Sequence, residues 1–255
     1  MFIAIDIGNT NITVSVKTGN EWEEHRISSV KLEPLQFYTQ QLINIAEILD
    51  LSELEGVGVS SVVPSLTNII LDASENVLHK TPLLIEKKWY HLLPISTPNP
   101  DEMGTDLLLN ALAAYQKFLR PTLIVDFGTA LTYTLINDKQ SIEGVAIAPG
   151  ISTSMNALAG NAAQLPEISL VLPDKYLGMN TAEAMSAGIL WGYVGQVNYM
   201  IDSIKASYPY KINTVATGGL SEVLKPLSKS FDEIDRNLTV SGIYHFFKLV
   251  QESHS

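Results

Sequence analysis

Two aspartates, Asp6 and Asp126, each stand at the end of an apolar run and lead into a short turn. The turns read Asp6-Ile7-Gly8-Asn9-Thr10 and Asp126-Phe127-Gly128-Thr129, so both combine a carboxylate with glycine and with hydroxyl or amide side chains. Such a carboxylate can bind a metal ion, and the backbone N–H groups of the turn can bind phosphate oxygens. A single motif of this kind is better explained as a hairpin turn. Its recurrence favours a ligand role, in which two turns hold one nucleoside triphosphate.

Two further motifs carry residues of interest. Ala216-Thr217-Gly218-Gly219 follows an apolar run and precedes a helical segment, and its glycines allow a flat ligand such as adenine to approach closely. On its own, this motif is merely a strand-to-helix turn. Gly104-Thr105-Asp106 opens a well-patterned helix, where the helix dipole favours an aspartate without any further function.

Strands and helices are expected to alternate in two similar halves. The first half is expected to hold strands at 2–7, 12–16, 22–28, 56–63 and 82–86, and helices at 35–49, after Pro64 and at 105–118. The second is expected to hold strands at 122–126, 131–136, 141–147 and 212–216, and helices at 151–163, 181–205, from Leu220 and at 241–251. Asp126 follows Asp6 by 120 positions (126 minus 6), which indicates a duplicated domain. The expected domains are residues 1–118 and 119–255, which meet beyond the linker-like stretch Pro94–Pro100.

Composition places the chain among globular proteins and excludes several partners. Of its 255 residues 46% are hydrophobic and 17% are charged, which leaves enough apolar side chains for a sizeable core. The net charge of −11 repels polyphosphate backbones, so nucleic acid and anionic membranes are not expected as partners. The absence of cysteine excludes disulfides, thiolate nucleophiles and cysteine-ligated metals.

Other chemistries lack their motifs. No Gly-Lys pair occurs, which excludes a Walker-type phosphate loop, and Gly56-Val57-Gly58 is not followed by the third glycine of a dinucleotide fingerprint. Neither a Gly-x-Ser-x-Gly nor a His-Glu-x-x-His sequence is present, and the five histidines show no metal-ligand spacing.

The N-terminus carries no basic or signal-like segment, so a cytoplasmic protein is expected. The stretch 184–201 has no formal charge and approaches the length of a membrane span, but its glycines and polar residues favour a buried or interface helix. The spacing Gly188-x-x-x-Gly192 would let a second helix approach closely, which makes this stretch a candidate self-association surface.

An ordered set of motifs resembles the type III pantothenate kinases over nearly the whole chain. The matching segments are Asp6–Asn11, Ser60–Pro64, Val125–Ala130, Ile147–Gly150, Gln164–Pro166, Asn180–Thr181, Gly192–Gln196 and Ala216–Leu220. The resemblance implies a duplicated actin-like (ribonuclease H-like, ASKHA) α/β fold with mixed central sheets flanked by helices. It further implies a homodimer with active sites at its interface and ATP-dependent phosphorylation of pantothenate to 4'-phosphopantothenate, the first step of coenzyme A biosynthesis.

The same resemblance implies roles for individual residues. The first phosphate loop would comprise Asp6, Ile7, Gly8, Asn9, Thr10, Asn11, Ile12 and Thr13, with Asp6 also a magnesium partner. Asp126 would bind a monovalent cation, potassium or ammonium, and Thr129, Gly218 and Gly219 would contact ATP. Substrate would be bound by Gly104, Thr105, Asp106, Leu107 and, across the dimer, Thr181. Asp106 would be the general base, a role that suits phosphoryl transfer, where positioning and charge neutralisation dominate.

Two positions depart from the family pattern. Leu107 stands where the family usually has arginine, and Thr97 stands where it tends to have tyrosine. Loss of one charge-assisted hydrogen bond costs roughly 1.5 to 3 kcal/mol, enough to weaken pantothenate binding about tenfold to a hundredfold. Two alternatives therefore stay open: a kinase of the same fold with a different small acceptor, and a non-catalytic nucleotide-binding regulator like the Bvg accessory factor proteins. The intact Asp106 favours an enzyme.

Overall fold

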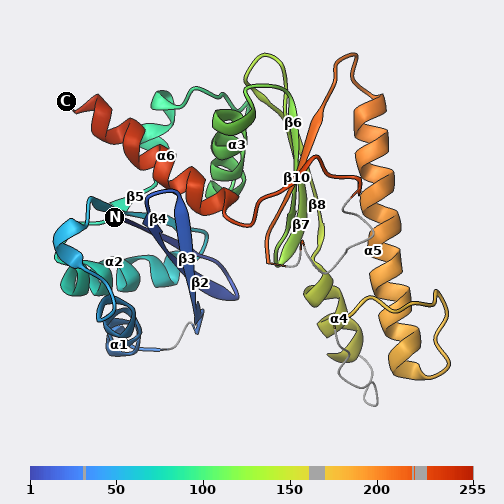
Figure 1. The fold of residues 1–255 in the computed structure, drawn as a ribbon, viewed down its shortest axis with the longest axis horizontal. Coiled ribbons are helices and arrows are strands. Elements are labelled where there is room, and N and C mark those ends of the chain that lie inside the picture. The colour runs from blue at the N-terminus through green and yellow to red at the C-terminus, as the bar shows by residue number, and fades with distance from the viewer. Residues whose placement is uncertain (31–32, 161–169, 220, 222–228, 255) are drawn as a thin grey trace. The chain divides into compact units, whose positions relative to one another are not determined.

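A computed structural model describes residues 1–30, 33–160, 170–219, 221 and 229–254. The chain forms two compact units, one of Met1–Ala113 with Asn237–Ser255 and one of Ala114–Arg236 (Figure 1). Each unit contains a five-stranded mixed sheet with helices packed on it. The expected α/β fold with mixed central sheets is confirmed.

The sheet of unit 1 has the order β3-β2-β1-β4-β5. Its strands are β1 (Phe2–Ile7), β2 (Asn11–Thr18), β3 (Glu21–Ser28), β4 (Gly56–Ser61) and β5 (Leu83–Leu84). β1 pairs antiparallel with β2 and parallel with β4, and it is apolar almost throughout because helices cover both of its faces.

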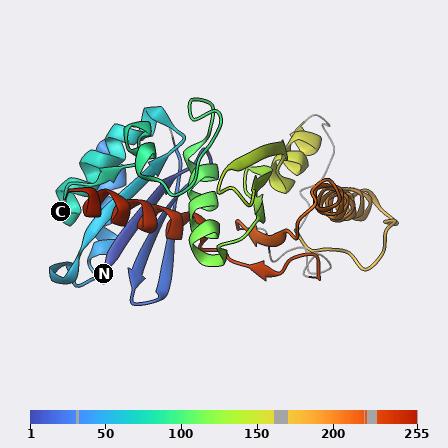
Figure 2. The same cartoon turned by 90° about the horizontal axis from the view of Figure 1, so that it is seen from above.

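Different helices cover the two faces of this sheet (Figure 2). α1 (Leu35–Ala46) and α2 (Pro64–Leu78) bury the face that carries Ile3, Ile5 and Ile7. α6 (Leu238–Ser253) packs on the opposite side of β1 and β4. There a Cβ on Gly58 would lie 2.6 Å from Ile243 Cγ2, so glycine is needed for the helix to approach this closely. The remaining elements of the unit are the short helices η1 (Leu51–Glu53) and η2 (Lys87–Leu92) and the first turns of α3 (Thr105–Phe118).

The sheet of unit 2 repeats the topology of the first, with the order β10-β9-β6-β7-β8. Its strands are β6 (Thr122–Phe127), β7 (Ala130–Ile136), β8 (Ile142–Pro149), β9 (Asn213–Thr217) and β10 (Glu233–Ile234). β6 pairs antiparallel with β7 and parallel with β9, as β1 does with β2 and β4. The strand order and direction therefore bear out the duplication that the two aspartate turns indicate.

Two helices of unit 2 share one apolar cluster with its sheet. α4 (Ile151–Gly160) and α5 (Thr181–Ala206) pack there against Leu123, Val125 and Tyr133. α5 begins with a capping box, in which the Asn180 side chain accepts a hydrogen bond from the Glu183 backbone N–H at 2.9 Å. No helix in the described residues is long and apolar enough to cross a membrane.

The compact units differ from the expected ranges 1–118 and 119–255 in two respects. The boundary between them falls inside α3, after Ala113, and not after residue 118. α6 comes last in the sequence but belongs to unit 1, because it packs on β1 and β4. The division at residue 118 remains a proposal for the two copies of the duplication, since β1 to β5 precede it and β6 to β10 follow it. The sequence analysis predicted no strand at the position of β10. The expected helix from Leu220 and the end of the expected helix 151–163 lie outside the described residues.

Candidate active site

Each of the two aspartates lies near the end of a central strand, between two hydroxyl residues. Asp6 is paired with Thr13 of β2 and with Ser60 of β4. Asp126 is paired with Thr132 of β7 and with Thr217 of β9. Paired residues project from the same face of a sheet, so each carboxylate stands in a row with two hydroxyl groups. This correspondence supports the interpretation of the two turns as repeated binding elements.

Two hydrogen bonds to backbone carbonyl groups close the turn after β1. The Gly8 N–H donates to the Asn11 carbonyl at 3.0 Å, and Ser29 Oγ donates to the Gly8 carbonyl at 2.7 Å. Asn9 and Thr10 are exposed at the tip. The side chains of Ile7 and Ile12 are buried in the core, so only the backbone of these two residues of the expected phosphate loop is available to a ligand.

The start of α3 is attached to the same end of the first sheet. Thr105 Oγ1 lies 3.1 Å from Ser60 Oγ and donates to the Ser61 carbonyl at 3.4 Å. Since Ser60 is paired with Asp6, these contacts bring Gly104, Thr105, Asp106 and Leu107 to the strand ends that carry Asp6. The structure thus brings together, within unit 1, the expected first phosphate loop and the expected general base.

Asp106 has a restricted environment. Its Oδ1 accepts a hydrogen bond from the Leu107 backbone N–H at 2.9 Å, and a Cβ on Gly104 would lie only 2.5 Å from the same oxygen. Burial raises the pKa of the Asp106 carboxyl, and backbone N–H groups oppose that rise in part. The pKa of Tyr90, in η2, is raised by burial and then by the charge of Asp106. A carboxyl whose pKa is raised by burial is typical of a general base or acid.

The two positions that depart from the family pattern also lie in unit 1. The side chain of Leu107 is only 8% exposed, and this residue reaches Asp106 through its backbone N–H. Thr97 Oγ1 is buried and has no hydrogen-bond partner among the residues that the structure describes. A buried hydroxyl without a partner is costly, so Thr97 is a polar group in a place where an apolar side chain would cost less.

In unit 2, the chain after β9 lies against the second aspartate. Gly218 has φ +87°, a conformation that favours glycine, and a Cβ there would lie 2.5 Å from Asp126 Oδ1 and 2.7 Å from the Phe127 carbonyl oxygen. Gly219, next along the chain, is exposed. The Thr129 carbonyl accepts hydrogen bonds from the Gly150 N–H at 3.0 Å and from Thr153 Oγ1 at 2.7 Å, which fixes the β6–β7 turn.

The oxygen atoms at these strand ends suit hard cations. The Asp126 carboxylate and the Phe127 carbonyl oxygen both lie close to Gly218, and such oxygens are the ligands that alkali and alkaline-earth ions prefer. No group of three or more acidic or histidine side chains that could hold a metal ion occurs among the described residues. Magnesium is usually bound by one or two carboxylates together with substrate phosphates, so single aspartates fit an ion that is held partly by a nucleotide.

Thr181, the expected substrate contact from the second half, is the first residue of α5 and is exposed. It borders an open cavity of about 720 Å³ with Met179, Asn180 and Gly188. Thr181 belongs to unit 2, and the residues around Asp106 belong to unit 1.

Two residues near the site had no assigned role in the sequence analysis. Ser60 connects the Asp6 strand to the start of α3, and Tyr90 carries a pKa raised in part by Asp106. For Ser60 the sequence contains a usable signal, because a serine near the end of an apolar run is a candidate for a site at the strand ends. Nothing in the sequence near Tyr90 indicates its relation to a residue 16 positions later (106 minus 90), because that relation depends on tertiary packing.

The two five-stranded mixed sheets of the same topology define a protein with a duplicated, actin-like α/β fold. Two solved structures share the fold over nearly the whole chain. A putative Baf family transcriptional activator from Campylobacter jejuni has a TM-score of 0.60 at 18% identity and covers 98% of this chain and 99% of its own. A putative 2-dehydro-3-deoxygalactonokinase from Sinorhizobium meliloti has a TM-score of 0.58 at 12% identity, with 98% and 99% covered.

The family itself follows from the sequence comparisons. The family model described as type III pantothenate kinase matches residues 2–203. The type III pantothenate kinase of Moorella thermoacetica is 39% identical over 246 residues, which cover 95% of this chain and 97% of the relative. That of Geobacillus kaustophilus is 36% identical over 258 residues, covering 100% and 98%. The chain belongs to the type III pantothenate kinase family.

Proposed function

We propose that this protein transfers the terminal phosphoryl group of ATP to pantothenate, giving 4'-phosphopantothenate at the start of coenzyme A biosynthesis in the cytoplasm. The observation that carries the proposal is the match to pantothenate kinases over 95% of the chain at 39% identity. The position of Asp106 at the strand ends that carry Asp6 adds support from unit 1.

In this proposal Asp106 is the general base. Its carboxylate accepts the proton of the pantothenate hydroxyl while the new oxygen–phosphorus bond forms and the bond between the γ-phosphorus and ADP breaks. The backbone N–H of Leu107 holds Oδ1 in place. Burial raises the pKa of this carboxyl, which makes it a stronger base than an exposed aspartate. Gly104, Thr105 and Leu107 supply the backbone of the acceptor site.

The phosphate side of the proposal rests on the two aspartate turns. The backbone of Gly8 to Thr13 and Thr129 bind the phosphates, and Gly218 and Gly219 bind the remainder of the nucleotide. Asp6 would hold magnesium, which would supply neutralisation of the phosphate charge. Asp126 would hold a potassium or ammonium ion, and the carbonyl oxygen of Phe127 near Gly218 supports this choice, because such cations prefer oxygen ligands.

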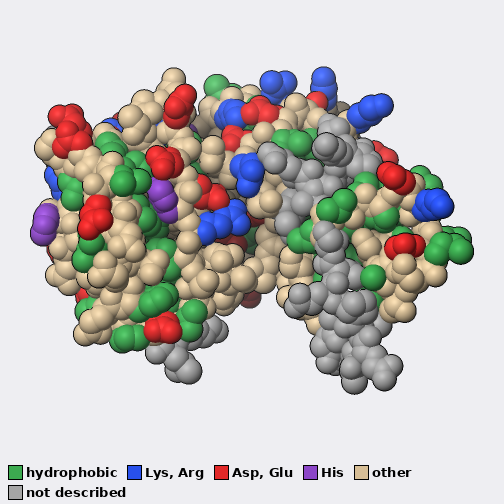
Figure 3. Space-filling view, turned by 60° about the horizontal axis from the view of Figure 1, so that its bottom comes forward, with side chains coloured by type: hydrophobic (Ala, Val, Ile, Leu, Met, Phe, Trp, Pro, Cys, Tyr) green, Lys and Arg blue, Asp and Glu red, His purple; other side chains and the backbone are tan. Residues whose placement is uncertain are grey.

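We also propose a homodimer that forms through α5. Ala184, Gly188 and Gly192 are exposed at successive turns of the helix, and a Cβ on either glycine would meet nothing within 4 Å. Large apolar side chains are exposed nearby, with Leu177 83% and Met179 89% exposed. Hydrophobic side chains are visible at the right-hand end of Figure 3. An exposed face of this kind is typical of an interface between chains, and Thr181 at its edge would contact substrate from the partner.

The test of the activity is ADP formation with pantothenate, ATP, magnesium and potassium, together with mass spectrometry of the product. We expect turnover by the wild type and by Asp101→Asn, which alters an exposed carboxylate 89% accessible in the loop before α3. Asp106→Asn is expected to abolish turnover. ATP binding without turnover of any acceptor would instead favour the regulatory alternative, and turnover of another acceptor alone would favour the related kinase.

The test of the dimer is the molar mass in solution, measured by light scattering after size-exclusion chromatography. Gly192→Leu is expected to give monomers, because the side chain would separate the two helices. Gly144→Leu, at an exposed strand position where a Cβ also meets nothing within 4 Å, is the control. A wild-type protein that is monomeric at high concentration would contradict the dimer.

A further inference from the structure

The row of side chains that contains Asp6 continues to the edge of the first sheet. Asp6 is paired with Thr13 of β2, and Thr13 is paired in turn with Arg26 of the edge strand β3. Paired residues project from the same face of a sheet, so Arg26 lies on the same face as the Asp6 carboxylate. Neighbouring strands are about 4.8 Å apart, which places the backbone of Arg26 one strand from Thr13 and about 10 Å from Asp6. The long side chain of arginine can cover much of that distance.

The end of β3 is attached to the expected phosphate loop. The Ser29 N–H donates to the Thr10 carbonyl at 3.0 Å, and the Ser29 hydroxyl donates to the Gly8 carbonyl at 2.7 Å. These hydrogen bonds fix the loop against the chain three residues after Arg26 (29 minus 26). The side chain of Arg26 is 46% exposed, so a ligand bound at the loop can meet it from the solvent side.

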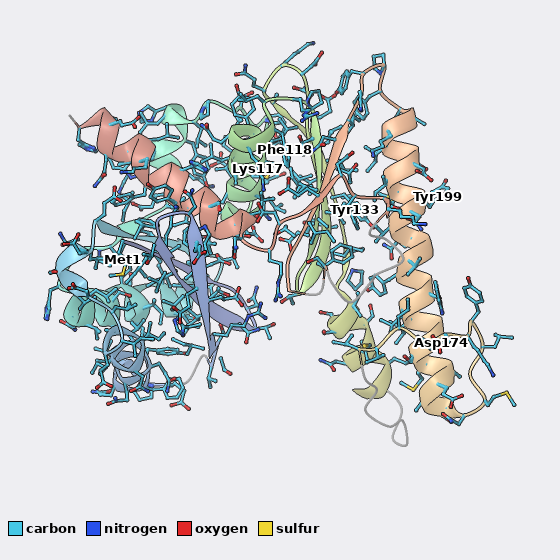
Figure 4. The ribbon with its side chains drawn as sticks, viewed as in Figure 1. Met1, Lys117, Phe118, Tyr133, Asp174 and Tyr199 are labelled. Carbon is cyan, nitrogen blue, oxygen red and sulfur yellow. The ribbon has the colours of Figure 1, made fainter. Side chains whose placement is uncertain are left out.

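The guanidinium of Arg26 is held by a single exposed carboxylate among the described residues. Its Nε donates to Glu24 Oε1 at 2.7 Å, and an exposed ion pair of this kind contributes little to stability. Lys117, labelled in Figure 4, is a contrasting case, because its ammonium donates to both Glu233 and Asp235. Two carboxylates keep the charge of Lys117 in place, whereas Arg26 can exchange its one partner for a stronger acceptor.

We propose that Arg26 binds the terminal phosphates of the nucleotide and exchanges Glu24 for phosphate oxygens when ATP occupies the loop. This inference rests on the proposed function, in which the loop binds the phosphates. A guanidinium offers two parallel N–H donors to phosphate oxygens, and such charge-assisted hydrogen bonds are about twice as strong as neutral ones. The other two arginines of the chain, Arg120 and Arg236, belong to unit 2, so Arg26 is the guanidinium that unit 1 supplies.

Calorimetric titration of the full chain with ATP and magnesium, without pantothenate, measures this contact. Arg26→Gln is expected to weaken ATP binding about tenfold. Arg26→Lys is expected to recover only part of the loss, because an ammonium keeps the charge but lacks the paired donors. Arg120→Gln is the matched control, since it removes the same charge from an exposed residue before β6, at the opposite end of that strand from Asp126.

A second variant tests the exchange of partners. Glu24→Gln removes the competing carboxylate, so we expect it to tighten ATP binding about twofold to fivefold. The same change is expected to have no effect in the Arg26→Gln background, because the two residues act on ATP only through their contact. An equal effect of Glu24→Gln in both backgrounds would contradict the exchange.

The outcomes separate this proposal from the proposed function. Pantothenate turnover by the wild type, with an equal Kd for ATP in Arg26→Gln and wild type or an equal loss in Arg120→Gln, would overturn the role of Arg26 alone. ATP binding that depends on Arg26, without turnover of pantothenate, would support this role and contradict the proposed function alone. A wild type that binds no ATP would overturn both.

Discussion

The strand ends with Asp6 and Asp126 are built on the same sheet topology and differ in what packs against them. Beside Asp6, the neighbouring strand carries Ser60 one residue before its end, and Ser60 contacts the start of a helix that carries Asp106. Beside Asp126, the neighbouring strand ends in Thr217 and leads into Gly218, whose backbone lies directly against the carboxylate. One copy of the duplication thus carries a second, partly buried carboxyl, and the other carries a close backbone contact.

In the proposed function, this difference gives the two copies different chemistry. A carboxyl with a raised pKa suits proton transfer, the role proposed for Asp106. A carboxylate with a carbonyl oxygen nearby suits cation binding, the role proposed for Asp126. A duplicated fold therefore need not duplicate function, because the residues that decide the chemistry come from neighbouring segments rather than from the repeated turn itself.

The largest expected effect distinguishes the role of Asp106 from the role of Asp126. Asp106→Asn is expected to lower kcat by about 10² to 10⁴-fold while the Kd for ATP stays within about twofold, because only the proton acceptor is lost. Asp126→Asn is expected to raise the KM for ATP and to abolish stimulation by potassium. Steady-state kinetics with calorimetric ATP titration measures both. If both variants changed kcat and the KM for ATP in the same way, the proposed division of roles between the two copies would be wrong.

Gly218→Ala tests the close contact in unit 2. The new Cβ would lie 2.5 Å from Asp126 Oδ1 on a backbone with φ +87°, so the change is expected to lower the free energy of unfolding by about 1 to 3 kcal/mol and to weaken ATP binding. Gly144→Ala is the control, since a Cβ at that strand position meets nothing within 4 Å. Denaturant unfolding curves compare them, and equal midpoints would contradict the importance of the contact.

The pH dependence tests Asp106. Its folded pKa is raised above the unfolded value of about 3.9, so the folded state loses stability as pH rises from that value through the raised pKa. Asp106→Asn is therefore expected to raise the melting temperature at neutral pH and to change it little near pH 3. As the pH is lowered, kcat/KM of the wild type is expected to decrease at a higher pH than it would if the general base were an exposed aspartate. A stabilising effect confined to acid pH would contradict the raised pKa.

The smallest expected effect concerns the link between β4 and α3. Ser60→Ala removes the hydroxyl that lies 3.1 Å from Thr105 Oγ1, and we expect a loss of about 0.5 to 1.5 kcal/mol in unfolding free energy with a modest fall in kcat. Ser52→Ala, in the surface helix η1, removes a hydrogen bond between exposed side chains and is the comparison. Thermal unfolding and kinetics of both variants would show whether the link positions Asp106.

Much of the fold was predictable because its signals are local. The helix expected at 105–118 is observed as Thr105–Phe118, and the helix expected at 181–205 is observed as Thr181–Ala206. Their apolar periodicity and starting residues, such as the Asn180 cap, act over a few neighbouring positions. The two-residue strand β10 and the membership of α6 in unit 1 depend on distant partners, so the local pattern contained no signal for them.

The features of the candidate site likewise fall into those that the local sequence predicts and those that depend on distant residues. The chain order by itself determined the repeated aspartate turns, the flanking glycines and the family resemblance, because turn chemistry is confined to consecutive residues. Only the tertiary structure decided that Ser60 contacts the start of α3 and that the backbone of Gly218 lies against the Asp126 carboxylate. It also decided that the Tyr133 hydroxyl is buried with no hydrogen-bond partner among the described residues. Burial, strand register and pKa depend on segments far apart in sequence, and packing alone brings those segments together.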